Sequence, residues 1–256
     1  CFNINEFTFT DQSNSSATYQ VKWEFGDANY ANSTPVLHSY SDSGIYKVQL
    51  FTETALGCKD TTFKSVQVYP MPKADVMVNN KSQCLTTNKF NFVDISKIGW
   101  GVIGSYWDFG DLTNSSFTTP QKTYSDTGKH TVTLISTSAF GCADTTSIDI
   151  WVREMPFVDF VINDSSQCLN QNEFVFTNKS TVNAGSIGSN WLFGDGTGSS
   201  IANPKKVFSS HGTFLNKLIV TSNFGCKDSV IESTYVRPMP VVSFSINDTD
   251  QCVNNN

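Results

Sequence analysis

The cysteines of this chain recur at a nearly constant interval. Seven cysteines occur among 256 residues, and they form two interleaved series in which neighbouring members lie 83 or 84 residues apart. The first series is Cys1, Cys84, Cys168 and Cys252, and the second is Cys58, Cys142 and Cys226. A period this regular indicates tandem copies of one structural unit.

Other sequence motifs recur with the same period as the cysteines. A Trp-x-Phe-Gly-Asp motif occurs at residues 23–27, 107–111 and 191–195, and a Gly-Cys pair follows it in each copy. A unit of about 84 residues is long for a solenoid repeat but suits a small sandwich that folds by itself.

Segments that contain proline end each unit, at residues 69–72, 153–156 and 237–240. Proline fixes φ and interrupts strand pairing, so these segments predict short, stiff linkers. The predicted domains are residues 1–70, which lack the first strand of the unit, then 71–154 and 155–238, and the start of a fourth repeat at 239–256. We expect them to follow one another as an extended rod.

Hydrophobic residues alternate in short runs within each unit, and no helical period occurs. In the second copy we expect strands at residues 74–79, 89–95, 105–109 and 119–124, a strand after the turn at 125–128, and a last strand at 145–152. About seven antiparallel strands of this kind predict an all-β, two-sheet sandwich. The third copy has Asn216 where the others have Val48 and Val132, which leaves its buried face undecided.

The motif, an aromatic residue about 13 positions later, a turn glycine and an alternating strand together resemble the PKD domain. The matching residues in the second copy are Trp107, Phe109, Gly110, Asp111, Tyr124, Gly128, Val132 and Leu134, and the pairs Trp23 with Tyr40 and Trp191 with Phe208 match in the other copies. The resemblance implies an immunoglobulin-like sandwich for each unit. The family's usual Gly-Asp-Gly ending is kept only at residues 194–196, because Ala28 and Leu112 replace the last glycine elsewhere.

Copies that bear cysteines and are separated by proline linkers also resemble the long repetitive surface adhesins of gliding Bacteroidota, the SprB type. This resemblance implies an extracellular stalk attached to the outer membrane, with a mechanical role in surface attachment or gliding. Its partners would be neighbouring repeats of the same chain, an outer-membrane anchor or motility machinery, and an external surface or polysaccharide contacted through other regions.

Charge and motifs argue against several other classes of protein. The formal net charge is −6 and the basic residues are scattered, so a nucleic-acid partner is not expected. The sequence contains no run of about 20 apolar residues that could insert into a membrane. His38, His130 and His211 fall at different phases of the repeat, and no hydrolytic triad or phosphate loop occurs. We expect no enzyme, no metal and no other cofactor.

The paired aromatic residues of the motif could stack on a ligand, but two aromatic residues on one face of a central strand are more typical of a core. We therefore assign a structural role to the motif residues. They are Trp23, Phe25, Gly26, Asp27, Trp107, Phe109, Gly110, Asp111, Trp191, Phe193, Gly194 and Asp195. The aspartates are expected to accept backbone N–H bonds in a turn.

Regular cysteines in a chain rich in Asn, Ser and Thr indicate disulfides formed outside the cytoplasm. In the strand order that the resemblance implies, the two cysteines of one unit lie at opposite poles, about 25 Å apart, too far for a disulfide. We therefore favour bonds between neighbouring domains, Cys1 with Cys142 and Cys84 with Cys226. On this hypothesis Cys58, Cys168 and Cys252 find partners outside the sequence. The rival hypothesis joins the two cysteines within each unit.

An Asp-Thr-Thr or Asp-Ser-Val triplet follows each Gly-Cys pair. It resembles the O-glycosylation acceptor of exported Bacteroidota proteins, which would place sugar on Thr61, Thr145 and Ser229. An exposed strand that begins a hairpin also favours Asp and Thr, so the structural explanation is equally open.

The sequence predicts a structural stalk segment of a repetitive, secreted cell-surface adhesin filament. The alternative is a set of polysaccharide-binding accessory repeats of a secreted hydrolase, and a further one is an array that assembles laterally into a surface lattice. Exposed aromatic residues in phase along the repeats would support the hydrolase alternative.

Overall fold

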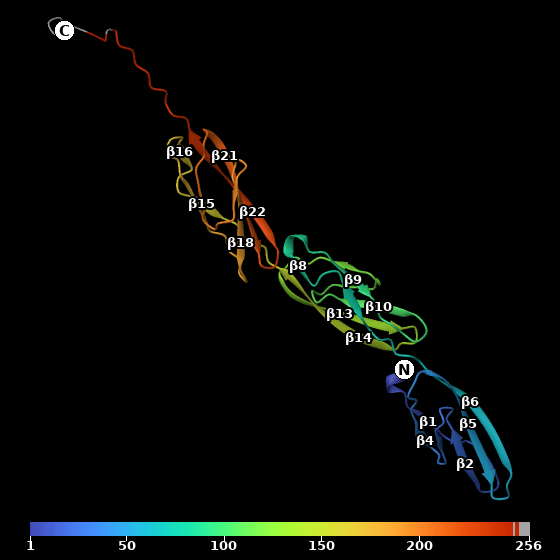
Figure 1. Cartoon of the computed structure of the whole chain (residues 1–256). Coiled ribbons are helices and arrows are strands. Elements are labelled where there is room, and N and C mark those ends of the chain that lie inside the picture. Colours follow the sequence, from blue (N-terminus) through green and yellow to red (C-terminus); the bar gives the residue numbers. More distant parts are fainter. Residues whose placement is uncertain (248, 251–256) are drawn as a thin grey trace. The chain divides into compact units, whose positions relative to one another are not determined.

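The structure is a computed structural model that describes residues 1–247, 249 and 250 (Figure 1). Residues 248 and 251–256 of the predicted fourth repeat, Cys252 among them, therefore lie outside the described residues. The chain divides into two units, one made of Cys1–Ser82 with Asn88–Val152 and the other of Gln83–Thr87 with the residues from Arg153 onward. The short helices are both 3-10, η1 (Phe2–Ile4) and η2 (Leu85–Thr87).

The first repeat has one sheet of four strands and one of two strands. The order is β3-β2-β5-β6 in the larger sheet and β1-β4 in the smaller one. The strands are β1 (Phe7–Phe9), β2 (Tyr19–Glu24), β3 (Tyr30–Ala31), β4 (Val36–His38), β5 (Gly44–Thr54) and β6 (Lys59–Val68). The core between the sheets consists of Trp23, Phe25, Tyr40, Val48, Leu50 and Val68.

The second repeat has a five-stranded sheet with the order β11-β10-β13-β14-β8 and a three-stranded sheet with the order β12-β9-β7. The strands are β7 (Val76–Val78), β8 (Ser82–Cys84), β9 (Phe90–Asp94), β10 (Ile103–Asp108), β11 (Asn114–Ser115), β12 (Gln121–Lys122), β13 (Gly128–Ser138) and β14 (Ala143–Arg153). Alternation along β13 buries Val132 and Leu134 completely, as the sequence predicts.

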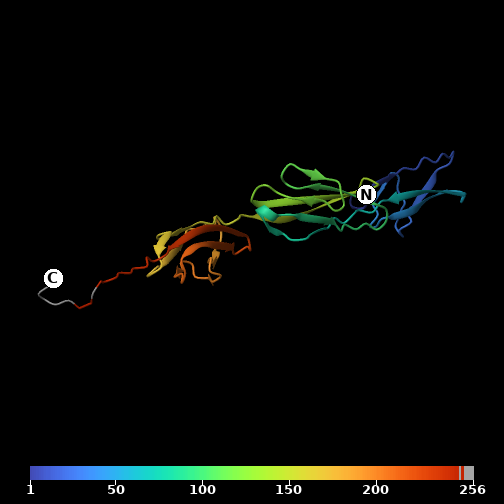
Figure 2. The ribbon, with the colours of Figure 1, turned by 90° about the horizontal axis from the view of Figure 1, so that it is seen from above.

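The third repeat has the same pair of sheets, with the orders β16-β22-β21-β18-β19 and β15-β17-β20. Figure 2 shows it as facing layers in yellow, orange and red. The strands are β15 (Phe160–Ile162), β16 (Ser166–Cys168), β17 (Phe174–Asn178), β18 (Ile187–Leu192), β19 (Gly198–Ser199), β20 (Lys205–Lys206), β21 (Gly212–Ser222) and β22 (Lys227–Arg237). Its core gathers around Phe160, Phe176, Trp191 and Leu218.

The all-β fold of tandem sandwiches is confirmed, with one correction to the expected strand pairing. The sequence predicts antiparallel strands, but β16 pairs with β22 in parallel, with Cys168 opposite Arg237. The chain leaves β15 in the smaller sheet and crosses to the edge of the larger one, so it meets β22 running in the same direction. This crossing places the first cysteine of the repeat beside the end of the last strand.

Asn216 occupies the buried face of β21 in the third repeat and is fully buried. Its Nδ2 donates to the carbonyl of Phe214 at 3.2 Å and to the hydroxyl of Thr234 at 3.1 Å. Thr234 stands where Val66 and Ile150 stand in the other repeats. The face that the sequence left undecided is therefore the core face, where a hydrogen-bonded polar pair replaces two aliphatic residues.

Candidate functional site: disulfides between successive repeats

The second cysteine of each repeat lies in the hairpin that joins the last two long strands. In the second repeat the N–H of Cys142 donates to Ser138 Oγ at 3.2 Å, and the N–H of Ser138 donates to the carbonyl of Cys142 at 2.8 Å. Gly141 has a φ of 79°, a left-handed conformation that favours glycine. The turn therefore requires a glycine before the cysteine, which explains the repeated Gly-Cys pair.

The first cysteine of each repeat lies at the opposite end of the sandwich. In the third repeat Cys168 is opposite Arg237 in the parallel register, and the N–H of Leu169 donates to the carbonyl of Arg237 at 2.9 Å. The first repeat has the equivalent bond, from the N–H of Phe2 to the carbonyl of Tyr69 at 2.9 Å.

This placement separates the two cysteines of one repeat by a strand. Cys168 lies beside the last residue of β22, and Cys226 directly precedes its first residue. The strand has 11 residues, which span about 33 Å at roughly 3.3 Å per residue. The Cα atoms of a disulfide lie within about 7 Å of each other, so a bond inside the repeat cannot form.

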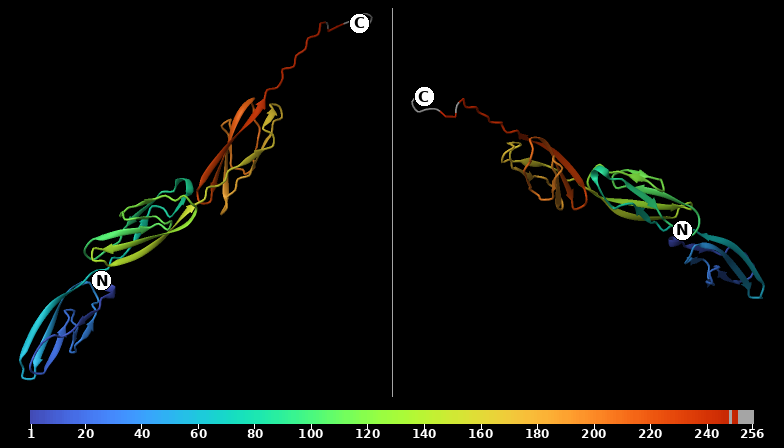
Figure 3. Two further views of the ribbon diagram at one scale, coloured as in Figure 1. Left: turned by 180° about the vertical axis from the view of Figure 1, so that it is seen from behind. Right: turned by 45° about the horizontal axis from the view of Figure 1, so that its top comes forward.

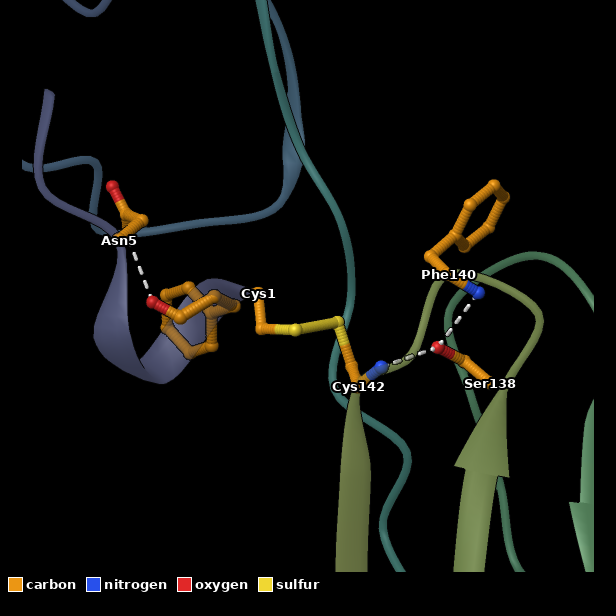
Figure 4. Close-up of a disulfide and its surroundings, with 6 residues drawn as sticks. Cys1, Asn5, Ser138, Phe140 and Cys142 are labelled. Carbon is orange, nitrogen blue, oxygen red and sulfur yellow. Dashed lines mark hydrogen bonds between the residues drawn. A yellow bond between two sulfur atoms is a disulfide. The ribbon is translucent and has the colours of Figure 1, made fainter.

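The structure instead contains two disulfides that join successive repeats. Cys1 is bonded to Cys142 and Cys84 to Cys226, each with a Cα–Cα distance of 5.5 Å. Figure 4 shows the first bond, with Ser138 Oγ accepting hydrogen bonds from the N–H groups of Cys142 and Phe140. These are the two pairs that the sequence analysis favoured, and the pairings within one unit do not occur in the structure.

Aromatic side chains of the linker and of the hairpin that carries Cys142 pack on one another. The ring of Tyr69, in the linker, stacks on Phe140 with centroids 4.2 Å apart and an interplanar angle of 14°. Trp100 packs edge-on against Phe140 at 5.0 Å. Asp144 Oδ2 accepts a hydrogen bond of 2.8 Å from the N–H of Ala74, which follows the linker. The linker is thus held by ring stacking and a hydrogen bond as well as by the disulfide.

The second disulfide has different chemistry at the equivalent positions. Arg153 stands where Tyr69 stands one period earlier, and its guanidinium lies 4.0 Å from the ring centroid of Phe224. Phe224 is the equivalent of Phe140. A cation–π contact therefore replaces the aromatic stack beside the bond.

Cys58 and Cys168 are free and exposed, and Cys252 is outside the described residues. Cys58 has the hairpin geometry of the bonded cysteines, because its N–H donates to Thr54 Oγ1 at 3.2 Å. Cys168 has the position of Cys84. One cysteine of each series is thus left without a partner in the structure, in the geometry in which its equivalents are bonded.

The Trp-x-Phe pairs lie in the cores. Trp107 is fully buried, and its Nε1 donates to the carbonyl of Phe117 at 2.8 Å. The aspartates form the expected turns, since the N–H of Thr113 donates to Asp111 Oδ1 at 3.2 Å. Gly110 has a φ of 74°, and a Cβ on it would lie 2.7 Å from the carbonyl oxygen of Thr131.

Sequence reasoning missed the partner of this aspartate. Lys122 Nζ lies 2.5 Å from Asp111 Oδ2 and 5.2 Å from the ring centroid of Tyr124, and Lys206 pairs with Asp195 in the same way at 2.6 Å. The signal was the recurrence of a lysine one period apart. In the first repeat His38 takes this position and lies 2.8 Å from Asp27.

The aspartate carboxyls have lowered pKa values in all three repeats. Burial raises the pKa of Asp111, but hydrogen bonds from Lys122 and Thr113 and the charge of the lysine outweigh it, so the pKa falls below its usual range. The same balance lowers the pKa of Asp195, and hydrogen bonds from Asn29 and His38 lower that of Asp27. The charged carboxylate is therefore the form that the fold stabilises.

The candidate glycosylation residues Thr61, Thr145 and Ser229 are exposed. No group of three His, Cys, Asp or Glu residues in the described part of the chain is arranged to hold a metal ion. Within the same residues, no helix has the length and hydrophobicity for a membrane span.

The comparisons with known proteins agree with the repeat pattern. The chain matches the PKD domain family three times, over residues 3–68, 70–152 and 153–237. It is similar to the crystal structure of the PKD1 domain of Vibrio anguillarum Epp, with 26% identity over 33% of this chain and 96% of that one, and a TM-score of 0.30. The PKD1 domain of the Vibrio cholerae metalloprotease PrtV also shares 26% identity, over 33% and 98% of the chains, with a TM-score of 0.27.

A third solved structure, described for host cell surface retention of a 1.5-MDa bacterial ice-binding adhesin, shares 9% identity over 88% of each chain with a TM-score of 0.37. The family assignment rests on the three sequence matches, which together span most of the chain. They coincide with the periods that the cysteines and the Trp-x-Phe-Gly-Asp motifs mark. The chain belongs to the PKD domain family, as a tandem array of three such domains.

Proposed function

We propose that this chain is a stalk segment of a repetitive, secreted cell-surface adhesin, built to carry tension. The observation that carries the proposal is the pairing of cysteines across successive repeats. A bond inside a domain stabilises that domain alone, whereas a bond between domains also restricts bending at the linker.

The contacts beside the bonds support the same role. Tyr69 and Arg153 stand at the linkers, and each packs on the phenylalanine of the hairpin that bears the bonded cysteine. The chemistry of the contact differs between the two positions, but its place does not. A repeat array that serves as a spacer needs every linker restrained, and we infer that this is what the periodic hairpin provides.

Disulfides form in oxidising compartments, which fits a secreted or surface protein. The proposal extends to attachment at the outer membrane and to gliding motility, with an anchor or motility machinery as partner and an external surface or polysaccharide bound by other regions. In a longer array Cys58, Cys168 and Cys252 would pair with cysteines of adjoining repeats. The sugar acceptors Thr61, Thr145 and Ser229 belong to the same proposal.

The alternative role, in polysaccharide binding beside a hydrolase, depends on aromatic residues exposed in phase. Residues 1–237 are all described, and no position among them carries an exposed aromatic residue in all three repeats. The aromatic residues that do recur, such as Trp23, Trp107 and Trp191, are buried. This distribution favours the stalk.

Solution X-ray scattering with and without reductant tests the stalk. We expect the oxidised chain to give the narrow distribution of dimensions of a stiff rod, and reduction to broaden it. The double variant Cys142→Ser with Cys226→Ser should behave like the reduced chain, while the matched variant Cys58→Ser should behave like the oxidised wild type. A compact oxidised particle, or a distribution that reductant leaves unchanged, would contradict the proposal.

A further inference from the structure

The last strand of each repeat leaves one edge of the larger sheet open along its first part. In the second and third repeats a strand of three residues, β8 or β16, lies beside it, and β16 pairs only with residues 235–237 of β22. The preceding residues 227–233 have β21 on one side and no strand of the described chain on the other. Figure 3 shows the equivalent strand of the first repeat, β6, in cyan. We call residues 59–65, 143–149 and 227–233 the open edges.

The open edge is a property of the fold of the repeat. The second repeat has a repeat before it and a repeat after it, and the odd-numbered residues of its open edge are exposed. They are Ala143, Thr145, Ser147 and Asp149. The odd-numbered residues of the other two open edges are exposed as well. The presence of neighbouring repeats therefore does not cover this edge.

The main-chain groups of these odd-numbered residues point away from the sheet. In the first repeat the N–H of Thr54 donates to the carbonyl of Cys58 at 2.9 Å, so the even-numbered residues of β6 bond to β5 and the odd-numbered ones face outward. The second repeat has the same alternation, because the N–H of Trp151 donates outward to the carbonyl of Lys81 at 2.7 Å. Each open edge is thus a row of main-chain donors and acceptors that a further strand could pair with.

Two of the open edges carry complementary charges. The edge of β6 has Lys59 and Lys64, with one aspartate, whereas the edge of β14 has Asp144 and Asp149 and no basic residue. Lys59 and Asp149 each form an exposed ion pair on their own sheet, at 3.3 and 2.8 Å. Exposed pairs of this kind contribute little to stability, so both side chains can turn to a new partner.

We propose that the open edge of β6 binds the open edge of β14 in a second copy of this chain. The two strands pair antiparallel, which is the more stable orientation per residue, and the two larger sheets become one continuous sheet. Main-chain hydrogen bonds give affinity, and the charges select the partner edge. This inference concerns contact between copies and does not depend on the stalk function.

One register satisfies both the hydrogen bonds and the charges. Residues that face outward must lie opposite each other, so odd-numbered residues of β6 pair with odd-numbered residues of β14. This condition allows Lys59 to lie opposite Asp149. The same register then places Lys64 opposite Asp144, and no other antiparallel register pairs both lysines with aspartates. Asp144 accepts the hydrogen bond from Ala74 through Oδ2, and Lys64 binds Oδ1.

The exposed ring of Phe63 lies in the middle of this contact. Its side chain is 59% exposed on the outer face of the first repeat. In the proposed register it lies opposite Thr145, on the same face of the continuous sheet. Aromatic and β-branched residues that face each other across two strands stabilise the pairing. The contact therefore also covers an exposed apolar side chain.

Charge reversal tests the pairing. The reference protein is the full chain with three substitutions that prevent other disulfides between copies, Cys58→Ser, Cys168→Ser and Cys252→Ser. Sedimentation at low ionic strength should show association that rises with concentration. Lys59→Asp or Asp149→Lys alone should weaken it by about tenfold or more, and an equal mixture of the two variants should restore it, because each contact again joins opposite charges. The matched variant Lys227→Asp, at the position of Lys59 in the third repeat, should change association little.

A disulfide tests the register. Thr61 lies opposite Ser147, and the Cα atoms of such a hydrogen-bonded pair are about 5.5 Å apart, within the range of a disulfide. Reference chains that carry Thr61→Cys or Ser147→Cys are mixed with oxidised glutathione. Each thiol loses its proton, the two sulfur atoms join, and the two electrons reduce the glutathione disulfide to two thiols. We expect this mixed dimer to form about tenfold faster than with Thr145→Cys in place of Ser147→Cys, since residue 145 lies two positions further along the strand.

Four results would each overturn the inference, once circular dichroism has shown that every variant is folded. The reference chain could stay monomeric, or the mixture of the two charge variants could fail to restore association. Lys227→Asp could weaken association as strongly as Lys59→Asp. The two cysteine pairs could cross-link at the same rate.

Discussion

The residue that pairs with the turn aspartate differs between the repeats, but every repeat has one. The turn aspartate is paired with Lys122 in the second repeat, with Lys206 in the third and with His38 in the first. All three partners lie against the same two aromatic residues of their repeat. The ring of His38 stacks on Phe25 at 4.1 Å, whereas the lysine ammonium of Lys122 lies 5.6 Å from the Phe109 centroid. The residue at this position must pair with the carboxylate and must also be able to lie on an aromatic ring.

The lowered pKa of Asp111 makes the stability of the second repeat depend on acid. A carboxyl whose pKa is lowered by folding stabilises the fold above the unfolded pKa, about 3.9, and this contribution is lost as the pH falls through the lower folded pKa. Asp111→Asn keeps the side-chain acceptor but removes the charge beside Lys122. We expect a loss of about 1–2 kcal/mol at pH 7 that shrinks below pH 4, measured as exchange protection of the β13 amides. Asp108→Asn removes a nearby exposed charge that pairs with no lysine among the described residues, and it should cost much less at either pH.

The buried polar pair in the third repeat gives a second prediction at this scale. Asn216→Val leaves the hydroxyl of Thr234 buried without its donor, which should cost about 1–3 kcal/mol. Adding Thr234→Ile restores the aliphatic pair of the second repeat and should recover most of that loss, because the two changes share one interaction. Hydrogen exchange of the β21 amides in the full chain measures both. Equal destabilisation by the single and double variants would show that the pair does not act as a unit.

The core residues were the most predictable feature at the residue scale. Phe90, Phe92 and Leu134 follow a period of two, and that period specifies the buried face without knowledge of the partner strand. The ion pair of Asp111 with Lys122 was not predictable in the same way. The two residues are 11 positions apart on a turn and a short strand, and only the folded sandwich brings them within 2.5 Å.

At the scale of elements, the turn after the Trp-x-Phe pair is the most constrained. A Cβ at Gly110 would lie 2.7 Å from the carbonyl oxygen of Thr131, and the residue also has a positive φ. Gly141 has a positive φ, but nothing lies within 4 Å of a Cβ there. We expect Gly141→Ala to cost about 1–2 kcal/mol from backbone strain alone. Gly110→Ala should cost clearly more because β13 must also shift, and thermal unfolding of the two variants compares them. Similar melting temperatures would contradict this explanation.

The strands that the sequence analysis did not predict are the short ones. Residues 89–95 and 145–152 were predicted as strands and are β9 (Phe90–Asp94) and β14 (Ala143–Arg153), with boundaries shifted by one or two residues. The edge strand β16 has three residues, too few to show alternation, and its parallel pairing depends on where the preceding loop crosses. The position of the first cysteine, and hence the disulfide pattern, came from the fold that the PKD resemblance implies and not from local pattern.

At the scale of the whole molecule, the two disulfides overlap along the sequence. Cys84 lies inside the loop closed by Cys1 and Cys142, and Cys142 lies inside the loop closed by Cys84 and Cys226. A force applied at the two chain ends passes from Cys1 directly to Cys142, then back along the second repeat to Cys84, and across to Cys226. Most of the first and third repeats lie in closed loops outside this shortest covalent path.

Force spectroscopy on the full chain, held at its two ends, tests this protection. The shortest oxidised path contains about 60 residues between Cys84 and Cys142 and about 30 after Cys226, so full unfolding should extend it to roughly 300 Å. The reduced chain should extend to roughly 870 Å, since all its residues can straighten. Cys142→Ser keeps only the bond between Cys84 and Cys226. The covalent path then runs along the chain from residue 1 to Cys84, crosses to Cys226 and continues to the end, so the chain should extend to roughly 390 Å. These lengths depend only on which cysteines are joined, so equal extensions before and after reduction would mean that the bonds do not carry the load. With the predicted lengths, the second repeat and the last strand of the third, β22, would straighten under load, and the first repeat would stay outside the loaded path until a disulfide is reduced.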